Sequence, residues 1–382
     1  MLPYGRQQID EEDVDAVVEV LRSELITQGP TIERFEAAIA DYLGVPHVVA
    51  FANGTAALHG AAFAAGLGPG DEVLTSPLSF VASANCALYQ GARPRFVDIS
   101  PRTWNLDAAA AAASVGHRTR AVIAVSFAGL PADLDPLEPV RDRVAVIEDA
   151  AHALGARRAG NPVGASGGAD MTTFSLHPVK AITSGEGGFV ATGSSELARL
   201  LRLFRTHGIT KDGVEPSPPE GGWYSEMQLL GFNYRITDFQ CALGLSQLRR
   251  LDERVMRRSQ IADRYRELLA DEARIALPPT APKGALHAYH LFVVRVLDGP
   301  KARLATFSAL RRAGIGVQVH YIPIYRQPYY RDVLGYPQDG CPAAEEYYWS
   351  AISLPIFPEM TEGEIERVVG ELQASLPVKR RE

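Results

Sequence analysis

Short β-branched runs alternate with alanine-rich runs over residues 45–200, and this alternation is the feature that most limits the fold of the chain. The β-branched runs predict strands, and the alanine-rich runs have helix-forming composition with a glycine or proline near one end. Such alternation is typical of βαβ units, so we expect an α/β protein with a mostly parallel sheet covered by helices on both faces. The predicted strands are 47–51, 72–76, 93–99, 120–127, 143–150 and 171–176.

The length of 382 residues exceeds what one compact core usually spans, which favours more than one domain. From about residue 275 onward, new segments predict a smaller α+β unit, with strands over 287–296 and 316–324 and a helix over 345–353. A long amphipathic segment that starts at Asp238 predicts one or two helices that connect the two units.

The remaining segments complete the predicted domain organisation. The Pro/Gly-rich segment 211–224 predicts a long loop, and an amphipathic stretch near the start predicts a helix in an arm that packs across the rest. We expect an N-terminal arm over 1–30, a large domain over 31–250 and a small C-terminal α+β domain over 251–382.

Composition argues against several classes of protein. The chain has 38 Lys and Arg against 45 Asp and Glu, a formal net charge of −7, and no basic block except its terminal "KRRE", so we expect no nucleic-acid partner. Cys86, Cys241 and Cys341 lie far apart without metal-ligand spacing, so we expect neither a bound metal nor disulfides. No apolar run approaches the ~18 residues of a membrane span, and no signal peptide is visible. We expect a cytoplasmic enzyme with small-molecule ligands.

The stretch "TFSLHPVKAITSGEGGFV" (173–190) places Lys180 in an apolar run, where burial of an ammonium group is costly. Asp149 ends a predicted neighbouring strand, and a buried carboxylate needs a positive partner. Ligands of parallel sheets bind beyond the carboxyl ends of the strands, so we expect these two side chains to share a crevice. The segment 53–61 leads from a strand into a helix whose first N–H groups suit an anion, and Ser175 adds a hydroxyl.

A reactive lysine, a carboxylate and a phosphate site together predict a binding site for pyridoxal 5′-phosphate. Lys180 would form the Schiff base, which removes the charge that burial penalises, and Asp149 would keep the pyridine nitrogen protonated. Each piece alone has a simpler interpretation. Asp149 alone suits a helix cap, Lys180 alone suits a surface lysine with a buried stem, and 53–61 alone is a helix start. Their order and spacing favour the cofactor site.

Several segments of the chain resemble the DegT/DnrJ/EryC1/StrS family of nucleotide-sugar aminotransferases, and within it the PseC-type enzymes. The resemblance implies fold type I of the pyridoxal-phosphate-dependent transferases, with a mostly parallel seven-stranded sheet, flanking helices and a smaller C-terminal domain. It also implies a homodimer with shared active sites. The segments that carry the resemblance are "LITQGPTIERFEAAIADYLGVPHVVAFANGTAALHGAAFAAGLGPGDEV", "IEDAAHALGA", "FSLHPVKAITSGEGGFV", "GFNYRITDFQCALGLSQL" and "VHYIPIY", with "LPYGRQQIDEED", "SPLSFVASAN" and "RTHGITKDG" for the PseC type.

The family pattern implies catalytic roles for Lys180, as Schiff-base lysine and proton shuttle, and for Asp149 at the pyridine nitrogen. It implies that His152 neighbours the phenolic oxygen of the cofactor and that Phe80 stacks on the ring. The implied phosphate contacts are Thr55, Ala56 and Ser175, together with Asn233 from the second subunit and Arg235 as its less certain companion. His177 matches a motif position without an assigned role.

The PseC-like pattern also implies substrate contacts. These are Tyr4, Glu24, Leu25, Ile26, Thr27, His320, Tyr321, Ile322 and Pro323. For His320 and Tyr321 the alternative is simple packing in the small domain. The presence of Lys180, where the dehydratases of the family have histidine, favours transamination.

The implied reaction is transfer of an amino group from L-glutamate to C4 of a UDP-4-keto-6-deoxy-N-acetylhexosamine, in pseudaminic-acid-type or related synthesis. One alternative is a C3 or C4 aminotransferase that acts on another keto-deoxy sugar, such as a dTDP-linked one. An alternative of another class is a non-catalytic regulator that binds the cofactor, but no helix-turn-helix or basic tail supports it.

Overall fold

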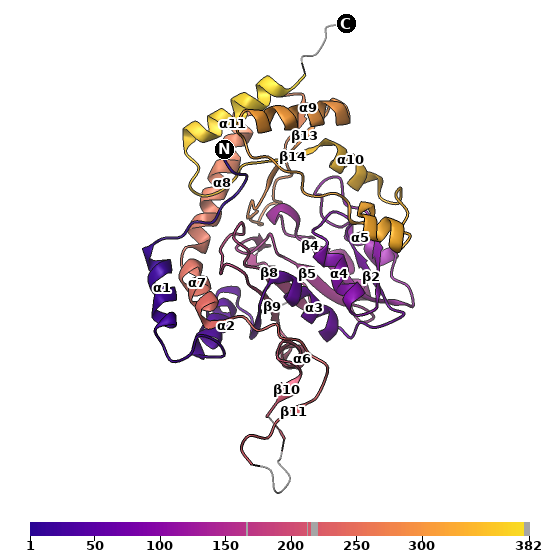
Figure 1. Ribbon diagram of the computed structural model, residues 1–382. Helices are drawn as coiled ribbons and strands as arrows, with labels where there is room; N and C mark the ends of the chain where they lie inside the picture. Colours follow the sequence, from indigo (N-terminus) through magenta and orange to yellow (C-terminus); the bar gives the residue numbers. More distant parts are fainter. Residues whose placement is uncertain (166, 212, 215–220, 378–382) are drawn as a thin grey trace.

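The computed structural model describes residues 1–165, 167–211, 213–214 and 221–377. A seven-stranded sheet with the strand order β1-β9-β8-β5-β4-β2-β3 forms the centre of the larger unit (Figure 1). The pairs from β8 through β5, β4 and β2 to β3 are parallel, whereas β9 runs antiparallel to both β8 and β1. The prediction of a mostly parallel α/β sheet is therefore confirmed. The strands are β1 (His47–Phe51), β2 (Glu72–Thr75), β3 (Arg93–Phe96), β4 (Thr119–Val125), β5 (Ala145–Asp149), β8 (Met171–Ser175) and β9 (Gly188–Thr192).

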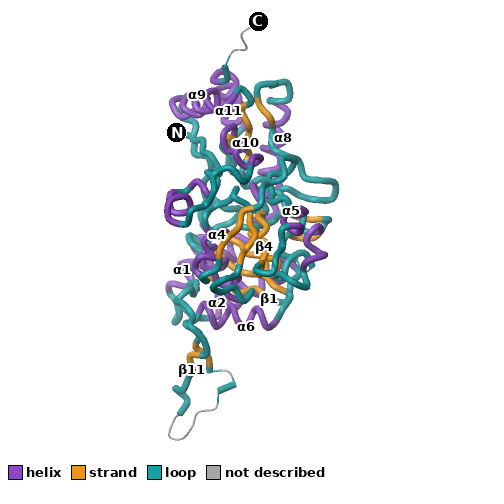
Figure 2. The backbone as a smooth tube through the Cα atoms, turned by 90° about the vertical axis from the view of Figure 1, so that its right-hand side faces the viewer, coloured by secondary structure: helices purple, strands orange, loops and turns teal. Residues whose placement is uncertain are grey.

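Both faces of this sheet are buried. Consecutive residues of a strand point to opposite faces, so two neighbours that belong to different core clusters show that both faces are covered. In β5, Ile147 belongs to a core cluster with alanines of α3, α4 and α6, whereas its neighbour Val146 belongs to a cluster with Ala108 and Ala111 of α5. Helices accordingly lie on both sides of the strands (Figure 2). Helices of the larger unit are α2 (Pro30–Leu43), α3 (Gly54–Ala64), α4 (Ala82–Tyr89), α5 (Ala108–Ala113), α6 (Ser195–Arg205) and α7 (Asp238–Leu248).

The smaller unit has a three-stranded antiparallel sheet in the order β12-β13-β14. Its core joins apolar residues of this sheet to residues of α8, α9 and α11, which lie above and beside the strands in Figure 1. The elements are α8 (Leu251–Leu268), β12 (Ile275–Ala276), β13 (Phe292–Val296), α9 (Gly299–Arg312), α10 (Pro342–Ser350), β14 (Ala351–Leu354) and α11 (Glu362–Ser375).

Several predicted boundaries are wrong. The strand predicted over 316–324 is absent, with a single bridge between Gln318 and Ser353. Pro323 lacks an N–H, the carbonyl of His320 accepts from the Tyr347 hydroxyl, and the N–H of Ile324 donates to the carbonyl of Pro77, so these groups form no ladder. The helix predicted over 345–353 ends at Ser350, where the chain enters β14. The predicted strand over 93–99 ends early, at Phe96. Sequence analysis also assigned no strand to the residues of β9.

Two helices, α7 and α8, follow one another as the link between the two units, as predicted. Leu251 and Val255 of α8 belong to the core of the larger unit, whereas Ile261 and Tyr265 belong to the core of the smaller one. One continuous helix thus contributes to both cores. The predicted loop over 211–224 lies partly outside the described residues; short strands β10 (Ile209–Thr210) and β11 (Glu226–Met227) flank it as a projecting hairpin (Figure 1).

The start of the chain contacts both units, although the domain limits proposed above remain a prediction. Leu2 pairs with Ile315 and lies in the small-unit core. Helix α1 (Glu11–Leu21) then packs against α7, with Asp10 and Asp13 forming its capping box. Asp13 is fully buried and accepts hydrogen bonds from Gln247 and, at 3.0 Å, from Arg250. This carboxylate therefore ties the first helix to the end of α7, through Gln247, and to the start of α8, through Arg250.

We expect Asp13→Ala to lower the free energy of unfolding by about 3 kcal/mol, because Gln247 and Arg250 lose a buried charged acceptor. Guanidinium unfolding of the variant measures this loss. The matched control is Asp15→Ala at an exposed position of the same helix, expected to change the value by less than about 0.5 kcal/mol. Equal losses in the two variants would contradict the assigned role of Asp13.

Candidate active site

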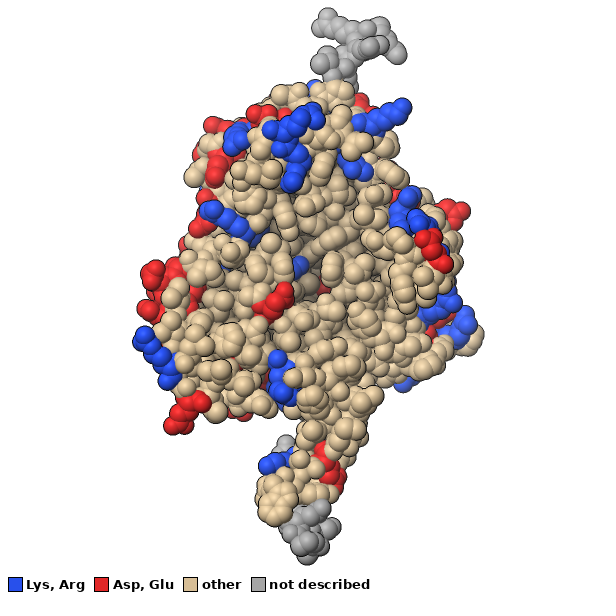
Figure 3. Space-filling view, viewed as in Figure 1, with Lys and Arg blue, Asp and Glu red and all other residues tan. Residues whose placement is uncertain are grey.

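A cavity of about 640 Å³ lies beyond the carboxyl ends of β4, β5 and β8 and is bounded on its other side by the smaller unit. The space-filling view shows a hollow between the two units, with charged side chains mostly toward the edges of this face (Figure 3). Many of the residues predicted from the sequence line this cavity together. They are Tyr4, Thr55, Ala56, Phe80, Asp149, His152, Ser175, Lys180, His320 and Tyr321, with His177 at the rim.

Other predicted residues lie elsewhere in this chain, and their roles remain predictions. Residues 24–27 form an exposed turn between α1 and α2. Asn233 is exposed and bridges to Thr206, and Arg235 lines a separate surface hollow. Ile322 is 44% exposed. Pro323 is buried, outside the cavity lining.

Asp149 ends β5 as a buried carboxylate. Its Oδ2 accepts a hydrogen bond of 2.5 Å from the Ser83 hydroxyl, and its Oδ1 accepts one of 3.1 Å from the backbone N–H of Ala151. Ser83 has one proton and gives it to Asp149, so the hydroxyl of Ser79, 2.6 Å away, donates to Ser83. Burial raises the pKa of Asp149, while these bonds and the charge of Lys180 oppose the rise. A ligand with a cationic ring nitrogen would stabilise the ionised carboxylate.

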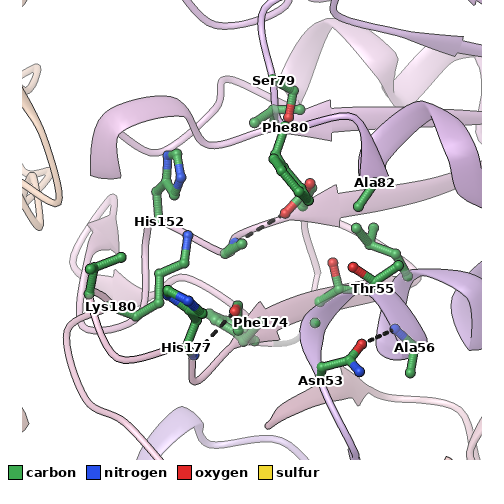
Figure 4. Close-up of a pocket in the computed structure, with 18 of the residues that line it drawn as sticks. Asn53, Thr55, Ala56, Ser79, Phe80, Ala82, His152, Phe174, His177 and Lys180 are labelled. Carbon is green, nitrogen blue, oxygen red and sulfur yellow. Dashed lines mark hydrogen bonds between the residues drawn. The ribbon is translucent and has the colours of Figure 1, made fainter. Parts of the chain in front are cut away.

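Lys180 follows β8 in a turn, which is closed by a hydrogen bond from the backbone N–H of Lys180 to the carbonyl of His177. Its side chain points into the cavity between His152 and His177 (Figure 4). Burial lowers the pKa of Lys180 to about 8, and the nearby carboxylate of Asp149 acts in the opposite direction. A sizeable share of this amine is therefore neutral near pH 8, which is the form that attacks a carbonyl group and accepts protons.

The N-terminus of α3 faces Lys180 across the cavity (Figure 4). Asn53 caps this helix by accepting from the N–H of Ala56 at 2.8 Å. Glycines allow the close approach of three segments here. A Cβ on Gly188 would lie 2.6 Å from the backbone nitrogen of Gly54, and one on Gly54 would lie 2.9 Å from Cβ of Ser175. The Ser175 hydroxyl accepts from the N–H of His177, so its own proton remains available to an anion.

Aromatic rings cover the remaining wall. The Phe80 side chain is 56% exposed although it is large and apolar, and its ring centroid lies 6.3 Å from that of Tyr321. The His152 ring lies 4.3 Å from that of His290, and burial lowers the pKa of both imidazoles. Burial also lowers the pKa of His320 to about 4, so this ring is neutral at physiological pH.

These groups fit pyridoxal phosphate. The buried carboxylate of Asp149 suits a ring nitrogen, the Phe80 ring suits a flat ring face, and Lys180 suits an aldehyde. The N-terminus of α3 with the Ser175 hydroxyl suits a phosphate. No group of three or more His, Cys, Asp or Glu side chains within the described ranges is arranged to hold a metal ion.

Sequence analysis missed several side chains of this site. Ser83 lies three residues after Phe80, near the start of α4, and its side chain is buried; a serine in this otherwise apolar, alanine-rich stretch was the available signal. His290 comes from the small unit, where nothing in the local sequence connects it to His152. Tyr89, Glu186 and Tyr234 also line the cavity.

A profile described as the DegT/DnrJ/EryC1/StrS aminotransferase family matches residues 7–373. The chain belongs to this family. Among curated relatives, spore coat polysaccharide biosynthesis protein SpsC of Bacillus subtilis (strain 168) is 38% identical over 374 residues, which cover 96% of this chain and 95% of SpsC. The resemblance inferred from the sequence motifs is thereby confirmed at the level of the family.

Solved structures agree with this assignment. Helicobacter pylori PseC, an aminotransferase involved in the biosynthesis of pseudoaminic acid, has a TM-score of 0.90 and 30% identity, with 98% of this chain and 99% of PseC covered. Spr1654 from Streptococcus pneumoniae in its PMP form has a TM-score of 0.92 and 29% identity, with 98% of this chain and 99% of that chain covered. Spr1654 also has a structure in its PLP form.

This family member is therefore a sugar aminotransferase that depends on pyridoxal phosphate. When bound, the cofactor supplies an electron sink for the carbon at which the amino group is exchanged. The predicted cofactor is thus confirmed.

Within the described part of the chain, no helix is long and apolar enough to cross a membrane.

The lowered pKa of Lys180 predicts its reactivity in the cofactor-free protein. The rate of acetylation by acetic anhydride, quantified by peptide mass spectrometry, is expected to rise with pH and to level off above about pH 8 at Lys180, because the neutral amine is the reactive form and its share saturates above the pKa. Lys301, exposed on α9, is the internal control for reagent activity and peptide recovery.

Asp149→Asn is expected to move the Lys180 profile to lower pH, because the carboxylate raises the pKa of this lysine. A Lys180 acetylation rate that still rises steeply with pH well above about pH 8 would show that the cavity does not desolvate the amine. An Asp149→Asn profile shifted to higher pH would show that the carboxylate does not act on it.

Proposed function

We propose that this enzyme transfers an amino group from L-glutamate to C4 of a UDP-4-keto-6-deoxy-N-acetylhexosamine, in amino-sugar synthesis of the pseudaminic-acid type. The observation that carries the proposal is the placement of Lys180 and Asp149 in one cavity, opposite the N-terminus of α3. The likeness to PseC along nearly the whole chain supports the choice of sugar and of carbon.

Each side chain has a separate task in this proposal. Lys180 Nζ accepts and returns the proton at the carbon that gains or loses the amino group, which its lowered pKa favours. Asp149, held by Ser83 and the N–H of Ala151, binds a positively charged ring nitrogen as an ionised carboxylate. Phe80 covers one face of the ring and excludes water from it.

The charge of the cavity supports a homodimer with shared sites. Among its described lining residues Lys180 is the single lysine or arginine, yet a sugar nucleotide brings a diphosphate and the cofactor brings a phosphate. Further donors are therefore needed, and Asn233 and Arg235 are the ones that we propose a second copy supplies. Exposed apolar side chains next to this segment, Leu230 at 76% and Phe232 at 38%, suit burial against that copy.

We propose that the substrate enters between the N-terminal segment and the small unit. Tyr4 and His320 line the cavity with their ring centroids 5.3 Å apart, and Tyr321 follows in the same wall. Residues 24–27, Ile322 and Pro323 complete the proposed contacts with the sugar nucleotide. Neutral aromatic and imidazole groups suit the polar but uncharged hydroxyl and acetamido groups of such a sugar.

Lys180→Ala is expected to reduce turnover by at least 10⁴-fold, because no other described amine lines the cavity. The same variant is expected to give no borohydride-trapped cofactor adduct by mass spectrometry. Lys301→Ala, on the exposed surface of α9, is the control and is expected to keep both properties. Full activity of Lys180→Ala would overturn the assignment of this lysine.

The substrate is tested with the purified, cofactor-supplemented enzyme and glutamate. We expect amination at C4 when UDP-4-keto-6-deoxy-AltNAc or UDP-4-keto-6-deoxy-GlcNAc is supplied, with the product and its C4 configuration identified by NMR. A panel of 3-keto and 4-keto dTDP-sugars is assayed in parallel. Preferred turnover of a dTDP-sugar, or amination at C3, would reject the proposed substrate while it leaves the family intact.

A further inference from the structure

Tyr321 stands in the cavity wall and contacts His152 through its hydroxyl. The distance between Tyr321 Oη and His152 Nε2 is 3.2 Å, and the two rings are nearly parallel, at 24°. Either atom of this pair is able to donate, so the contact by itself does not show which way the proton points. The other nitrogen of the imidazole decides the question.

His152 Nδ1 accepts a hydrogen bond of 3.3 Å from the backbone N–H of Ala128. A backbone N–H only donates, so Nδ1 carries no proton. The peptide group that carries this N–H is held in place, because its carbonyl, that of Phe127, accepts a hydrogen bond of 3.0 Å from the N–H of Leu130. The carbonyl of Ala128 accepts from the N–H of Leu291, and the carbonyl of Gly129 accepts from the N–H of Ala288, which joins this loop to the small unit. The tautomer of His152 is therefore set by the backbone.

A neutral imidazole without a proton on Nδ1 has its proton on Nε2. The doubly protonated ring is disfavoured, because a proton on Nδ1 would face the N–H of Ala128 and because burial lowers the pKa of His152. Lys180 and His320 add to this lowering, and the neighbouring His290 is neutral as well. It follows that His152 donates and Tyr321 Oη accepts.

The proton of Tyr321 is then free for another acceptor. In the part of the chain that the structure describes, His152 is the one hydrogen-bond partner of Tyr321 Oη. Burial raises the pKa of the phenol, so the hydroxyl keeps its proton at physiological pH. The Tyr321 ring also packs against Phe127, at 6.3 Å between centroids, and against Phe80, which restricts its orientation.

We propose that Tyr321 donates a hydrogen bond to the carbonyl oxygen of the keto substrate and that His152, fixed by the Ala128 amide, orients it for this task. This inference rests on the proposed function. A donor held in a site that excludes water stabilises negative charge as it develops on such an oxygen, and loss of one donor of this kind costs about 10²-fold in rate. His152 is accordingly a positioning residue for Tyr321.

The activity test uses Tyr321→Phe, which removes only the hydroxyl. We expect kcat with saturating glutamate and the keto sugar to fall about 100-fold, with the visible spectrum of the bound cofactor unchanged. The matched control is Tyr265→Phe, which removes a buried hydroxyl that donates to the carbonyl of Pro355 in the small-unit core. We expect that control to melt at a lower temperature and to keep its kcat.

Two outcomes of the activity test would overturn the inference. One is a kcat of Tyr321→Phe within threefold of the wild type. The other is a shift of the cofactor spectrum in this variant before any sugar is added, which would show that the hydroxyl bonds to the cofactor instead of to the substrate.

The tautomer is measured independently of turnover. In protein labelled with ¹⁵N in the histidine rings, we expect the His152 signals to report a proton on Nε2 and none on Nδ1, in both the wild type and Tyr321→Phe. The signals are assigned by their loss in His152→Gln. A proton on Nδ1 would overturn the inference. Absence of turnover by the wild type on every keto sugar would instead reject the proposed function and would leave this tautomer measurement valid.

Discussion

The structure depends on the burial of opposite charges at the ends of two adjacent parallel strands. Asp149 ends β5 and is buried, Lys180 follows β8 and is half-buried, and burial removes part of the water that normally stabilises each charge. Each lowers the cost of the other, and Ser83 and the N–H of Ala151 hold the carboxylate in place. In the proposed function the cofactor would complete this arrangement, since it would bring a cationic ring for the acid and an aldehyde for the amine.

The rest of the fold limits the exposure of these two side chains to solvent and fixes their orientation. Helix α8 contributes to the cores of both units, and the loop of Ala128 and Gly129 is bonded to the chain just before β13. The small unit therefore approaches the cavity with His290, His320 and Tyr321 in defined positions. The neutral state of these imidazoles leaves Lys180 as the principal cation of the cavity within this chain, which is why the proposed phosphate contacts from a second copy matter.

Much of the fold and of the candidate site could be predicted from the sequence, because the signals that indicate them are local. Each of three signals occupies a single stretch of sequence. They are the β-branched runs of the buried strands, the alanine-rich runs of the helices and the lysine in an apolar run. Errors arose where local signals conflict with packing. Residues 316–324 look like a strand, but the carbonyl of His320 and the N–H of Ile324 bond to other segments and Pro323 has no N–H, so this stretch stays out of the sheet. The glycine run that leads into β9 obscured this strand, although Gly188, the last glycine of the run, lets β9 approach the start of α3.

The sequence by itself determined the alternating α/β architecture, the cofactor and the pair Lys180 and Asp149, because each follows from residue type, order and spacing along one stretch of chain. Only the tertiary structure decided which groups surround that pair. Ser83 reaches Asp149 from a helix on one face of the sheet, and the amide of Ala128 sets the tautomer of His152 and thereby the direction of the Tyr321 hydroxyl. These contacts join segments far apart in the chain, and their geometry arises only when the whole sheet and the small unit pack together.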